Sequence, residues 1–403
     1  MLGKTVELDV TNIAHGGIAV ARLDGRVIFV SDAIPGERVL ARISADARSK
    51  FWRAETLSVI APSEFRQPHV WVEASIDRDP EDRAGGAEFG HINLAHQREL
   101  KRQVLADALQ RMAGLPFDGV VEALPGDDES KGTGWRTRVR LHVGDSGRPG
   151  PYAARSHRVI EVTTLPLATA ELAEVAPLDG EFEAGTELDL LSPSVGSARL
   201  FYGKQKPSTI TELVGEREFR LSDTGFWQVH RGAAAALTSA VQQAIDADLF
   251  DPRAANLDLY GGVGLFAAAV ADRFGTTTRI TSVESEETAT EFAGANLAEW
   301  TGATAESGRV ERWLKEYAKN PSARWNAATV ILDPPRSGAG AEVVESLVAT
   351  KPAQIVYVAC DPVAFARDAK LLADRGYELV SLRALDLFPN THHVEAIGSF
   401  RRL

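Results

Sequence analysis

The chain contains very little cysteine and no long apolar run. It has one cysteine in 403 residues, which excludes an intramolecular disulfide framework and a metal or iron–sulfur cage made of cysteines alone. No apolar run approaches the ~18 residues that a membrane-spanning helix needs. The opening stretch MLGKTVELDV alternates as a strand does and lacks the pattern of a secretory signal. These absences predict a soluble, cytoplasmic protein with no membrane partner.

The remaining composition predicts two or three globular domains. An apolar fraction of 44% is enough for full hydrophobic cores. The net charge of −12 argues against nucleic-acid binding over the whole surface, although it leaves room for a local basic groove. Nothing in the chain indicates a protein partner or an oligomer, so we expect a monomer.

The first 222 residues predict two domains. In residues 1–62, short alternating runs such as TVELDVTNI and RVIFV are separated by turn sequences such as HGG and DG, which is typical of a small β-barrel. A polar, proline-bounded segment then marks a boundary. Residues 63–222 predict a central mixed α+β domain, with a helix over 94–113 that stops at Gly114.

Residues 223–403 predict an α/β domain. Apolar runs of four to six residues alternate with helical segments, which is typical of a doubly wound, Rossmann-like sheet. Such sheets bind their ligands at the carboxyl ends of the strands.

The strongest basic bias lies between residues 131 and 158, with seven Lys or Arg and one acid. Arg136, Arg138 and Arg140 alternate, so a strand would place all three on one face. That face is either a solvated outer surface or a surface for nucleic-acid phosphates. Arg155 and Arg158 are further candidates for the same surface.

The stretch LDLYGGVGLFAAAV reads as a strand, a glycine turn and a helix start. Its Gly262-x-Gly264-x-x-Ala267 pattern is close to a dinucleotide fingerprint, and Glu284 ends the next strand, where it fits a ribose contact. Only one α/β half follows the turn, which favours S-adenosylmethionine over a nicotinamide cofactor. A later strand ends in DPPR at 333–336. This stiff loop either only terminates the strand or holds a planar base beside a methyl donor.

Four motifs in this order carry a family resemblance: LDLYGGVG, ILDPPRSG, VYVACDPVAFARD and LFPNTHHVEAIGSF. They resemble the RNA 5-methyluridine methyltransferases that use S-adenosylmethionine. FWQVH at 226–230 resembles the entry to that family's catalytic domain. The N-terminal segment resembles the small RNA-binding barrel called TRAM. The resemblance covers most of the chain and favours ribosomal RNA over transfer RNA as the substrate.

The resemblance implies a role for single residues. Cys360 matches the nucleophile and Glu395 the general base. The cofactor-binding candidates are Gln228, Tyr260, Gly262, Gly264, Glu284 and Asp333. The RNA-binding candidates are Arg136, Arg138, Arg140, Arg155, Arg158 and Arg336.

The chemistry explains why a cysteine and a base are needed. C5 of uracil is a poor nucleophile, but addition of a thiolate at C6 turns the ring into an enolate that attacks the methyl group. A base then removes the C5 proton so that the thiol leaves. Enzymes that make 5-methylcytosine typically use two cysteines, and this chain has one, which favours uridine. The target base must leave its stack to reach the thiol.

The sequence departs from the family at several positions. Gly261 replaces a common cysteine, and Asp361 stands where asparagine is usual. A carboxylate at Asp361 would raise the thiol pKa if it pointed inward. Some relatives hold an iron–sulfur cluster with four cysteines, whose positions fall here on Arg78, Ala84, Ala87 and Leu165. We therefore expect no metal and no cluster.

Other functions remain open on the residues alone. A small cysteine is often simply a core residue. A methyltransferase acting on another base, such as an adenine amino group, would leave Cys360 and Glu395 without a role. A non-catalytic RNA-binding protein on the same fold, and more distantly a nicotinamide oxidoreductase, complete the alternatives. We expect His392 and His393 to support the structure and not to act as bases.

Overall fold

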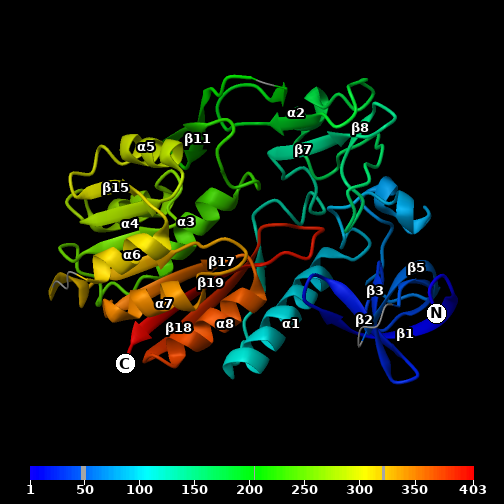
Figure 1. The fold of residues 1–403 in the computed structure, drawn as a ribbon, viewed down its shortest axis with the longest axis horizontal. Helices are drawn as coiled ribbons and strands as arrows, with labels where there is room; N and C mark the ends of the chain where they lie inside the picture. The colour runs from blue at the N-terminus through cyan, green and yellow to red at the C-terminus, as the bar shows by residue number, and fades with distance from the viewer. Residues whose placement is uncertain (47–50, 204, 320–322) are drawn as a thin grey trace.

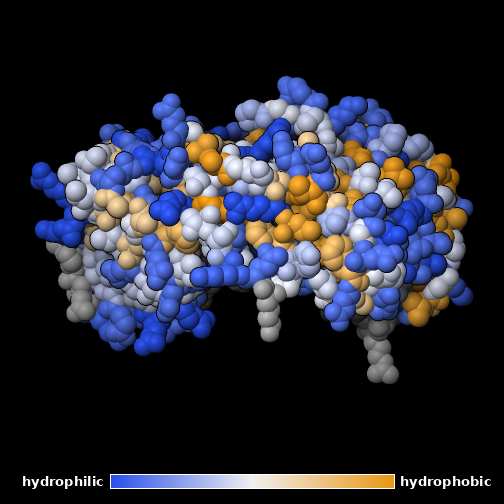
Figure 2. All heavy atoms as spheres, turned by 90° about the horizontal axis from the view of Figure 1, so that it is seen from above, coloured by the Kyte–Doolittle hydropathy of each residue, from blue (hydrophilic) through white to orange (hydrophobic). Residues whose placement is uncertain are grey.

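The computed structural model describes residues 1–46, 51–203, 205–319 and 323–403. A barrel at the N-terminal end, a β-rich central part and a large sheet flanked by helices follow one another (Figure 1). In Figure 2 the half of the surface that carries the large sheet is mainly hydrophilic, while hydrophobic side chains gather over the other half. Within the described residues, no helix combines the length and the apolar character needed to cross a membrane.

The N-terminal part forms a closed five-stranded barrel, as predicted. Its strands pair in the order β1-β2-β3-β5-β4. Alternate side chains point inward, and Leu8, Val10, Ile28 and Val30 belong to its separate apolar core. The strands are β1 (Thr5–Ala14), β2 (Ile18–Leu23), β3 (Arg26–Ser31), β4 (Arg38–Ala45) and β5 (Phe51–Ala61).

The central part is built around a four-stranded sheet of order β10-β9-β7-β8 and a two-stranded hairpin, β11-β12. Its core surrounds the fully buried Trp135. The elements are η1 (Val72–Ala74), η2 (Pro80–Asp82), β7 (Arg138–Val143), β8 (Pro149–Gly150), α2 (Ala170–Val175), β9 (Glu187–Leu191), β10 (Arg199–Tyr202), β11 (Thr209–Val214) and β12 (Arg217–Ser222).

The C-terminal part confirms the predicted α/β class. The strands of its sheet are β13 (Asn256–Leu259), β14 (Ile280–Glu284), β15 (Ala303–Ser307), β16 (Thr329–Leu332), β17 (Gln354–Ala359), β18 (Tyr377–Asp386) and β19 (Glu395–Arg402). The segments around them are α3 (Ala233–Ala244), α4 (Leu265–Phe274), α5 (Glu287–Asn296), α6 (Val310–Ala318), η3 (Ala323–Trp325), α7 (Gly340–Ala349) and α8 (Pro362–Ala373).

The sheet has the order β15-β14-β13-β16-β17-β19-β18-β6. The strands from β15 to β17 are parallel, whereas β19 runs antiparallel to both β17 and β18. Helices cover both faces. Successive residues of β17 therefore alternate between two apolar cores: Ile355 and Tyr357 lie in one, and Val356 and Val358 in the other.

Two elements within the residues of the predicted central domain join the part of the chain that contains the large sheet. Strand β6 (Val121–Ala123) pairs in parallel with β18, and helix α1 (Leu94–Ala113) packs along α8. A single boundary at residues 222 and 223 therefore separates segments that the fold joins. The periodicity of residues 94–113 predicted a helix correctly, but periodicity does not say which element a helix packs against.

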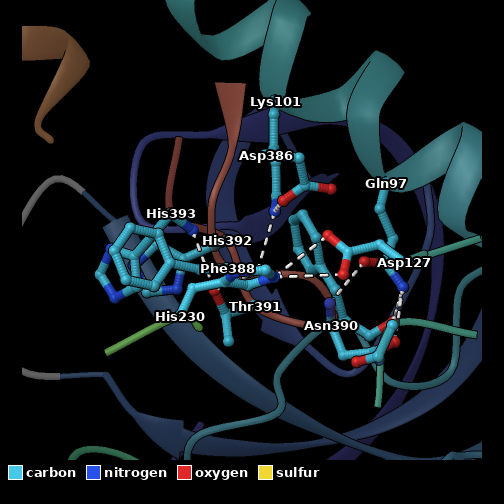
Figure 3. A network of polar contacts seen from close by, with 12 residues as sticks. Gln97, Lys101, Asp127, His230, Asp386, Phe388, Asn390, Thr391, His392 and His393 are labelled. Carbon is cyan, nitrogen blue, oxygen red and sulfur yellow. Dashed lines mark hydrogen bonds and ion pairs between the residues drawn. The ribbon is translucent and has the colours of Figure 1, made fainter. Parts of the chain in front are cut away.

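A buried polar network ties α1 to the segment between β18 and β19 (Figure 3). The Gln97 amide donates to Asn390 Oδ1 over 2.9 Å, and Asn390 Nδ2 donates to the carbonyl of Gly132 over 2.7 Å. Lys101 Nζ lies 2.5 Å from Asp386 Oδ1 and 3.0 Å from the carbonyl of Phe388. Both charged side chains of this ion pair are almost fully buried, so each depends on the other.

We expect Lys101→Met to destabilise the part of the chain that contains the large sheet by about 3–5 kcal/mol, because Asp386 then becomes a buried, uncompensated carboxylate. Urea unfolding followed by tryptophan fluorescence measures this. The double variant Lys101→Met/Asp386→Leu should lose much less. Lys315→Met, which breaks an exposed pair with Glu342, is the control and should change little. A Lys101→Met variant as stable as this control would contradict the prediction.

Candidate active site

Three residues of the candidate site stand at neighbouring strand ends at one edge of the sheet. Cys360 directly follows β17, and Asp333 directly follows β16, its parallel neighbour. Glu395 is the first residue of β19. Ala359 pairs with Ala396 in the antiparallel ladder between β17 and β19. Cys360 and Glu395 are the next residues beyond this pair, and the charge of Glu395 acts on the Cys360 thiol.

Burial and like charge raise the pKa of each acid in this group. Glu395 is buried, and its pKa is raised well above the usual value by burial and by the Asp333 carboxylate. Burial and then Asp258 raise the pKa of Asp333. Burial, with Glu395 and Asp333 adding to it, raises the pKa of the Cys360 thiol to about 12, while Arg336 acts in the opposite direction. In the free protein the thiol is therefore protonated at neutral pH.

The carboxylate of Asp361, the residue after Cys360, makes its hydrogen bonds to helix α8 and to the barrel and not to the thiol. Its Oδ1 caps helix α8, accepting from the backbone N–H groups of Val363 (3.0 Å) and Ala364 (2.8 Å). Its Oδ2 lies 2.7 Å from Nε2 of His15, which belongs to the barrel. The inward orientation that would raise the thiol pKa is therefore not the one observed.

The glycine turn after β13 leaves open space beside its backbone. Gly262 and Gly264 have φ of 54° and 90°, and Tyr260 also adopts a left-handed conformation, with φ of 62°. The Gly262 N–H donates to Glu284 Oε2 over 3.1 Å. A side chain at Gly262 would meet open space. The predicted residues Tyr260, Gly262, Gly264 and Glu284 thus surround one turn at the edge of the sheet.

The sequence analysis did not single out Asp258, a buried residue of β13 that supports the glycine turn. Asp258 is fully buried, and its Oδ2 accepts from the Ala267 N–H over 3.0 Å and from Ser282 Oγ over 3.3 Å. Burial raises its pKa. Within the described residues, Oδ1 has no hydrogen-bond partner. The available signal was an acid inside the apolar run LDLY, since a buried carboxylate needs a specific environment.

The packing explains why glycine fits at position 261. A Cβ on Gly261 would lie 2.0 Å from Ser282 Oγ and 2.9 Å from Asp258 Oδ2. The cysteine that is common at this position therefore has no room beside Ser282.

The FWQVH segment is held by its last residue. His230 is buried, accepts from the Gly232 N–H at Nδ1 over 2.9 Å and therefore donates from Nε2 to Asp127, 3.1 Å away. Its ring stacks on Trp135. Gln228, two residues earlier, is half-buried. The anchored histidine fixes the backbone that carries Gln228.

Each of the predicted arginines contacts another group of the protein. Arg136 precedes β7 and lies over the Trp135 ring. Arg138 donates to the carbonyl of Gly225 over 2.6 Å. Arg140 makes two hydrogen bonds to Asp189, at 2.7 and 2.9 Å. The remaining contacts are Arg155 with Glu55 (3.8 Å), Arg158 with Asp82 (2.5 Å) and Arg336 with His393 (3.4 Å).

A cavity of about 730 Å³ lies between the barrel and the central part. It reaches His392, three residues before Glu395. Arg42, Arg83, Arg155 and Arg158 line it together with Asp32, Glu55, Glu81 and Glu88. His91, also in the lining, is buried, and neither ring nitrogen has a hydrogen-bond partner among the described residues. The cavity therefore offers donors and acceptors with balanced charge.

Comparisons with known proteins identify the family. A family model described as tRNA (Uracil-5-)-methyltransferase matches residues 218–401, and a TRAM domain model matches residues 1–57. The chain is 34% identical to a protein of Streptomyces avermitilis named as an uncharacterized RNA methyltransferase, over 98% of both chains. It is 30% identical to the 23S rRNA (uracil(1939)-C(5))-methyltransferase RlmD of Pseudomonas aeruginosa, over 99% of this chain and 94% of that one.

The chain belongs to the RNA uracil-5-methyltransferase family. It is therefore a member of an S-adenosylmethionine-dependent methyltransferase family. Its fold is also similar to that of the Pyrococcus abyssi tRNA (uracil-54, C5)-methyltransferase, solved in complex with S-adenosyl-L-homocysteine. That likeness has a TM-score of 0.69 at 21% identity and covers 98% of this chain and 100% of the other.

In this methyltransferase, Gly261→Ala should lower the free energy of unfolding by about 1–3 kcal/mol, because the new methyl group overlaps Ser282 Oγ. Urea unfolding measures the change. Adding Ser282→Ala should recover part of the loss. Gly294→Ala is the matched control, because a Cβ there meets nothing within 4 Å. Equal stability of Gly261→Ala and the control would contradict the predicted overlap.

Glu395→Gln should increase the rate at which iodoacetamide alkylates Cys360 at pH 10, roughly three- to ten-fold. Removal of the carboxylate should lower the pKa of the thiol, and each pKa unit changes the thiolate concentration about tenfold. The ionised Glu395 carboxylate opposes the thiolate. The difference should shrink as the pH falls, because the raised pKa of Glu395 favours its protonated form.

The chain has one cysteine, so intact mass spectrometry reports this thiol alone. Glu378→Gln, an exposed position paired with Arg401, is the control. An unchanged or slower rate in Glu395→Gln would contradict the electrostatic account.

Proposed function

We propose that this protein transfers a methyl group to C5 of a uridine in structured RNA, with 23S ribosomal RNA as the substrate. The observation that carries the proposal is the pairing of β17 with β19, which brings the one thiol of the chain close to the buried carboxyl of Glu395. A nucleophile and a base at the same strand edge suit addition to C6 followed by proton removal at C5.

We propose the following steps. The Cys360 thiol first loses its proton to solvent. The thiolate Sγ then bonds to C6, and the π electrons of the C5–C6 bond are delocalised onto O4 as an enolate. C5 of the enolate would then accept the methyl group that bound S-adenosylmethionine supplies. The Glu395 carboxylate takes the C5 proton. The C5–C6 double bond re-forms, and the Cys360 thiolate leaves. Burial of Glu395 supports this role, because a raised pKa makes the ionised carboxyl a stronger base.

The glycine turn fits the cofactor that the proposal requires. S-adenosylmethionine, when bound, supplies the methyl group as a sulfonium. We propose that Glu284 holds its ribose and that Gly262 and Gly264 admit it close to the backbone. Gln228, Tyr260 and Asp333 complete the cofactor site. The open space at Gly262 and the unpartnered Oδ1 of Asp258 support this fit.

The RNA would reach the site beside Arg136 and Arg336. Burial lowers the pKa of Arg136, Glu88 acts in the opposite direction, and the charge of Arg336 lowers it again. The charges of the two guanidinium groups repel each other, and a phosphate of the RNA backbone would relieve that repulsion. The flipped uridine then lies at the strand edge, and neighbouring nucleotides extend towards the cavity below the barrel. Arg155 and Arg158 line that cavity, whereas Arg138 and Arg140 would first have to exchange partners within the protein.

The choice of ribosomal RNA rests on the Pseudomonas aeruginosa relative, which is named for 23S rRNA and aligns with almost the whole chain.

We also propose that the chain holds no iron–sulfur cluster. Ala84, Ala87 and Leu165 pack in one apolar core, where side-chain burial would replace the cluster as the stabilising element.

RNA containing 5-fluorouridine tests the mechanism directly. With S-adenosylmethionine and 23S rRNA fragments, a covalent protein–RNA complex should form that survives a denaturing gel. Fluorine at C5 does not leave as a proton, so the Cys360–C6 bond persists. Sequencing the trapped RNA identifies the uridine, and transfer RNA offered in parallel tests the preference.

Cys360→Ala is the control and should form no complex, although it should bind cofactor and RNA normally. If the wild-type protein binds both ligands and traps no RNA, the covalent mechanism is wrong. If it traps only transfer RNA, the proposed substrate is wrong and the mechanism stands.

A further inference from the structure

The turn between β1 and β2 of the barrel contacts both catalytic motifs of the large sheet. His15, in this turn, lies 2.7 Å from Asp361, the residue after Cys360. Gly17, in the same turn, lies so close to His392 that a Cβ on it would be 2.3 Å from the histidine Cβ. His392 is three residues before Glu395. One barrel turn therefore contacts the nucleophile's segment and the base's segment.

The contact between His15 and Asp361 is an ion pair. Asp361 raises the pKa of His15, and His15, together with the backbone N–H groups of α8, lowers the pKa of Asp361. The contact thus favours the charged form of both groups. The pair joins residues 346 positions apart, and its side chains are only partly exposed to solvent, His15 at 50% and Asp361 at 22%.

Asp361 is adjacent to Cys360, so the charge of its carboxylate bears on the ionisation of the thiol. The adjacent thiol already faces Glu395 and Asp333, and Arg336 is the cation that opposes them. A third unpaired carboxylate beside Cys360 would disfavour the thiolate further. The two backbone donors at the start of α8 hold Oδ1, but only His15 contacts Oδ2 within the described residues.

We propose that His15 is a positioning residue for Cys360: its imidazolium neutralises Asp361 and holds that carboxylate towards the barrel, away from the thiol. The barrel is then part of the catalytic site as well as a surface for RNA. This inference rests on the proposed function only in treating Cys360 as the nucleophile. The other charged groups nearby are Glu395, Asp333 and Arg336 around the thiol, and Glu88 facing His392 at 3.6 Å.

Alkylation of Cys360 by iodoacetamide tests the proposal without RNA or cofactor. At pH 7, His15→Ala should react about three-fold more slowly than wild type, which is the effect of half a pKa unit. The difference should disappear by pH 10, because His15 is neutral there in the wild type also. Asp361→Asn, which keeps a capping side chain, should react at the wild-type rate.

The double variant His15→Ala/Asp361→Asn separates charge from structure. With no carboxylate left to neutralise, it should return to the wild-type rate even though the link to the barrel is still missing. Arg38→Ala is the control, because it breaks an exposed ion pair with Asp9 inside the barrel. Thermal melting verifies that all variants are folded.

Two results would overturn the proposal: a wild-type alkylation rate in His15→Ala, or a double variant that remains as slow as His15→Ala. Neither depends on methyl transfer, so a failure here is separate from a failure of the proposed function. If RNA methylation is then measured, His15→Ala should lower kcat and leave the KM for S-adenosylmethionine unchanged. Adding Asp361→Asn should restore kcat.

Discussion

The site depends on the antiparallel insertion of β19 between β17 and β18. In a parallel sheet, only residues at the carboxyl ends of strands reach the ligand-binding edge. Glu395 is at the amino end of its strand, so it reaches that edge because β19 runs in the opposite direction. The register is equally important. A slip of one residue would turn Glu395 to the other face of the sheet and away from Cys360.

Buried polar groups hold the segment that delivers β19 to this position. Asn390 is fully buried in a left-handed conformation and is bonded to Gln97 and to the carbonyl of Gly132. Lys101 and Asp386 form a nearly inaccessible ion pair next to it (Figure 3). Such groups destabilise a fold when they are only partly satisfied, but they specify one arrangement when they are paired. Helix α1 therefore belongs with the sheet, although it precedes most of the central part in the chain.

The pKa values of the site are raised because several acidic side chains are buried close to one another. Asp258 raises the pKa of Asp333, Asp333 raises that of Glu395, and both Asp333 and Glu395 raise that of Cys360. Each group loses hydration and faces a like charge, so each favours its neutral form. Perturbed pKa values concentrated at one strand edge are typical of a functional site. Arg336 acts in the opposite direction on the thiol, and His15 contacts the far side of Asp361.

The sequence was enough to predict the barrel, the α/β class and the glycine turn followed by Glu284. These features are local, because strand periodicity and turn residues can be recognised within a few residues. Cys360 and Glu395 became candidates through the family resemblance of the motifs that contain them. The pairing of β6 with the sheet, the bonds between Arg140 and Asp189, and the contact of Asp361 with the barrel were not predictable in this way. Those outcomes depend on contacts between distant segments, such as the 346 positions that separate His15 from Asp361. No local pattern encodes them, because they arise only when separately formed elements pack together.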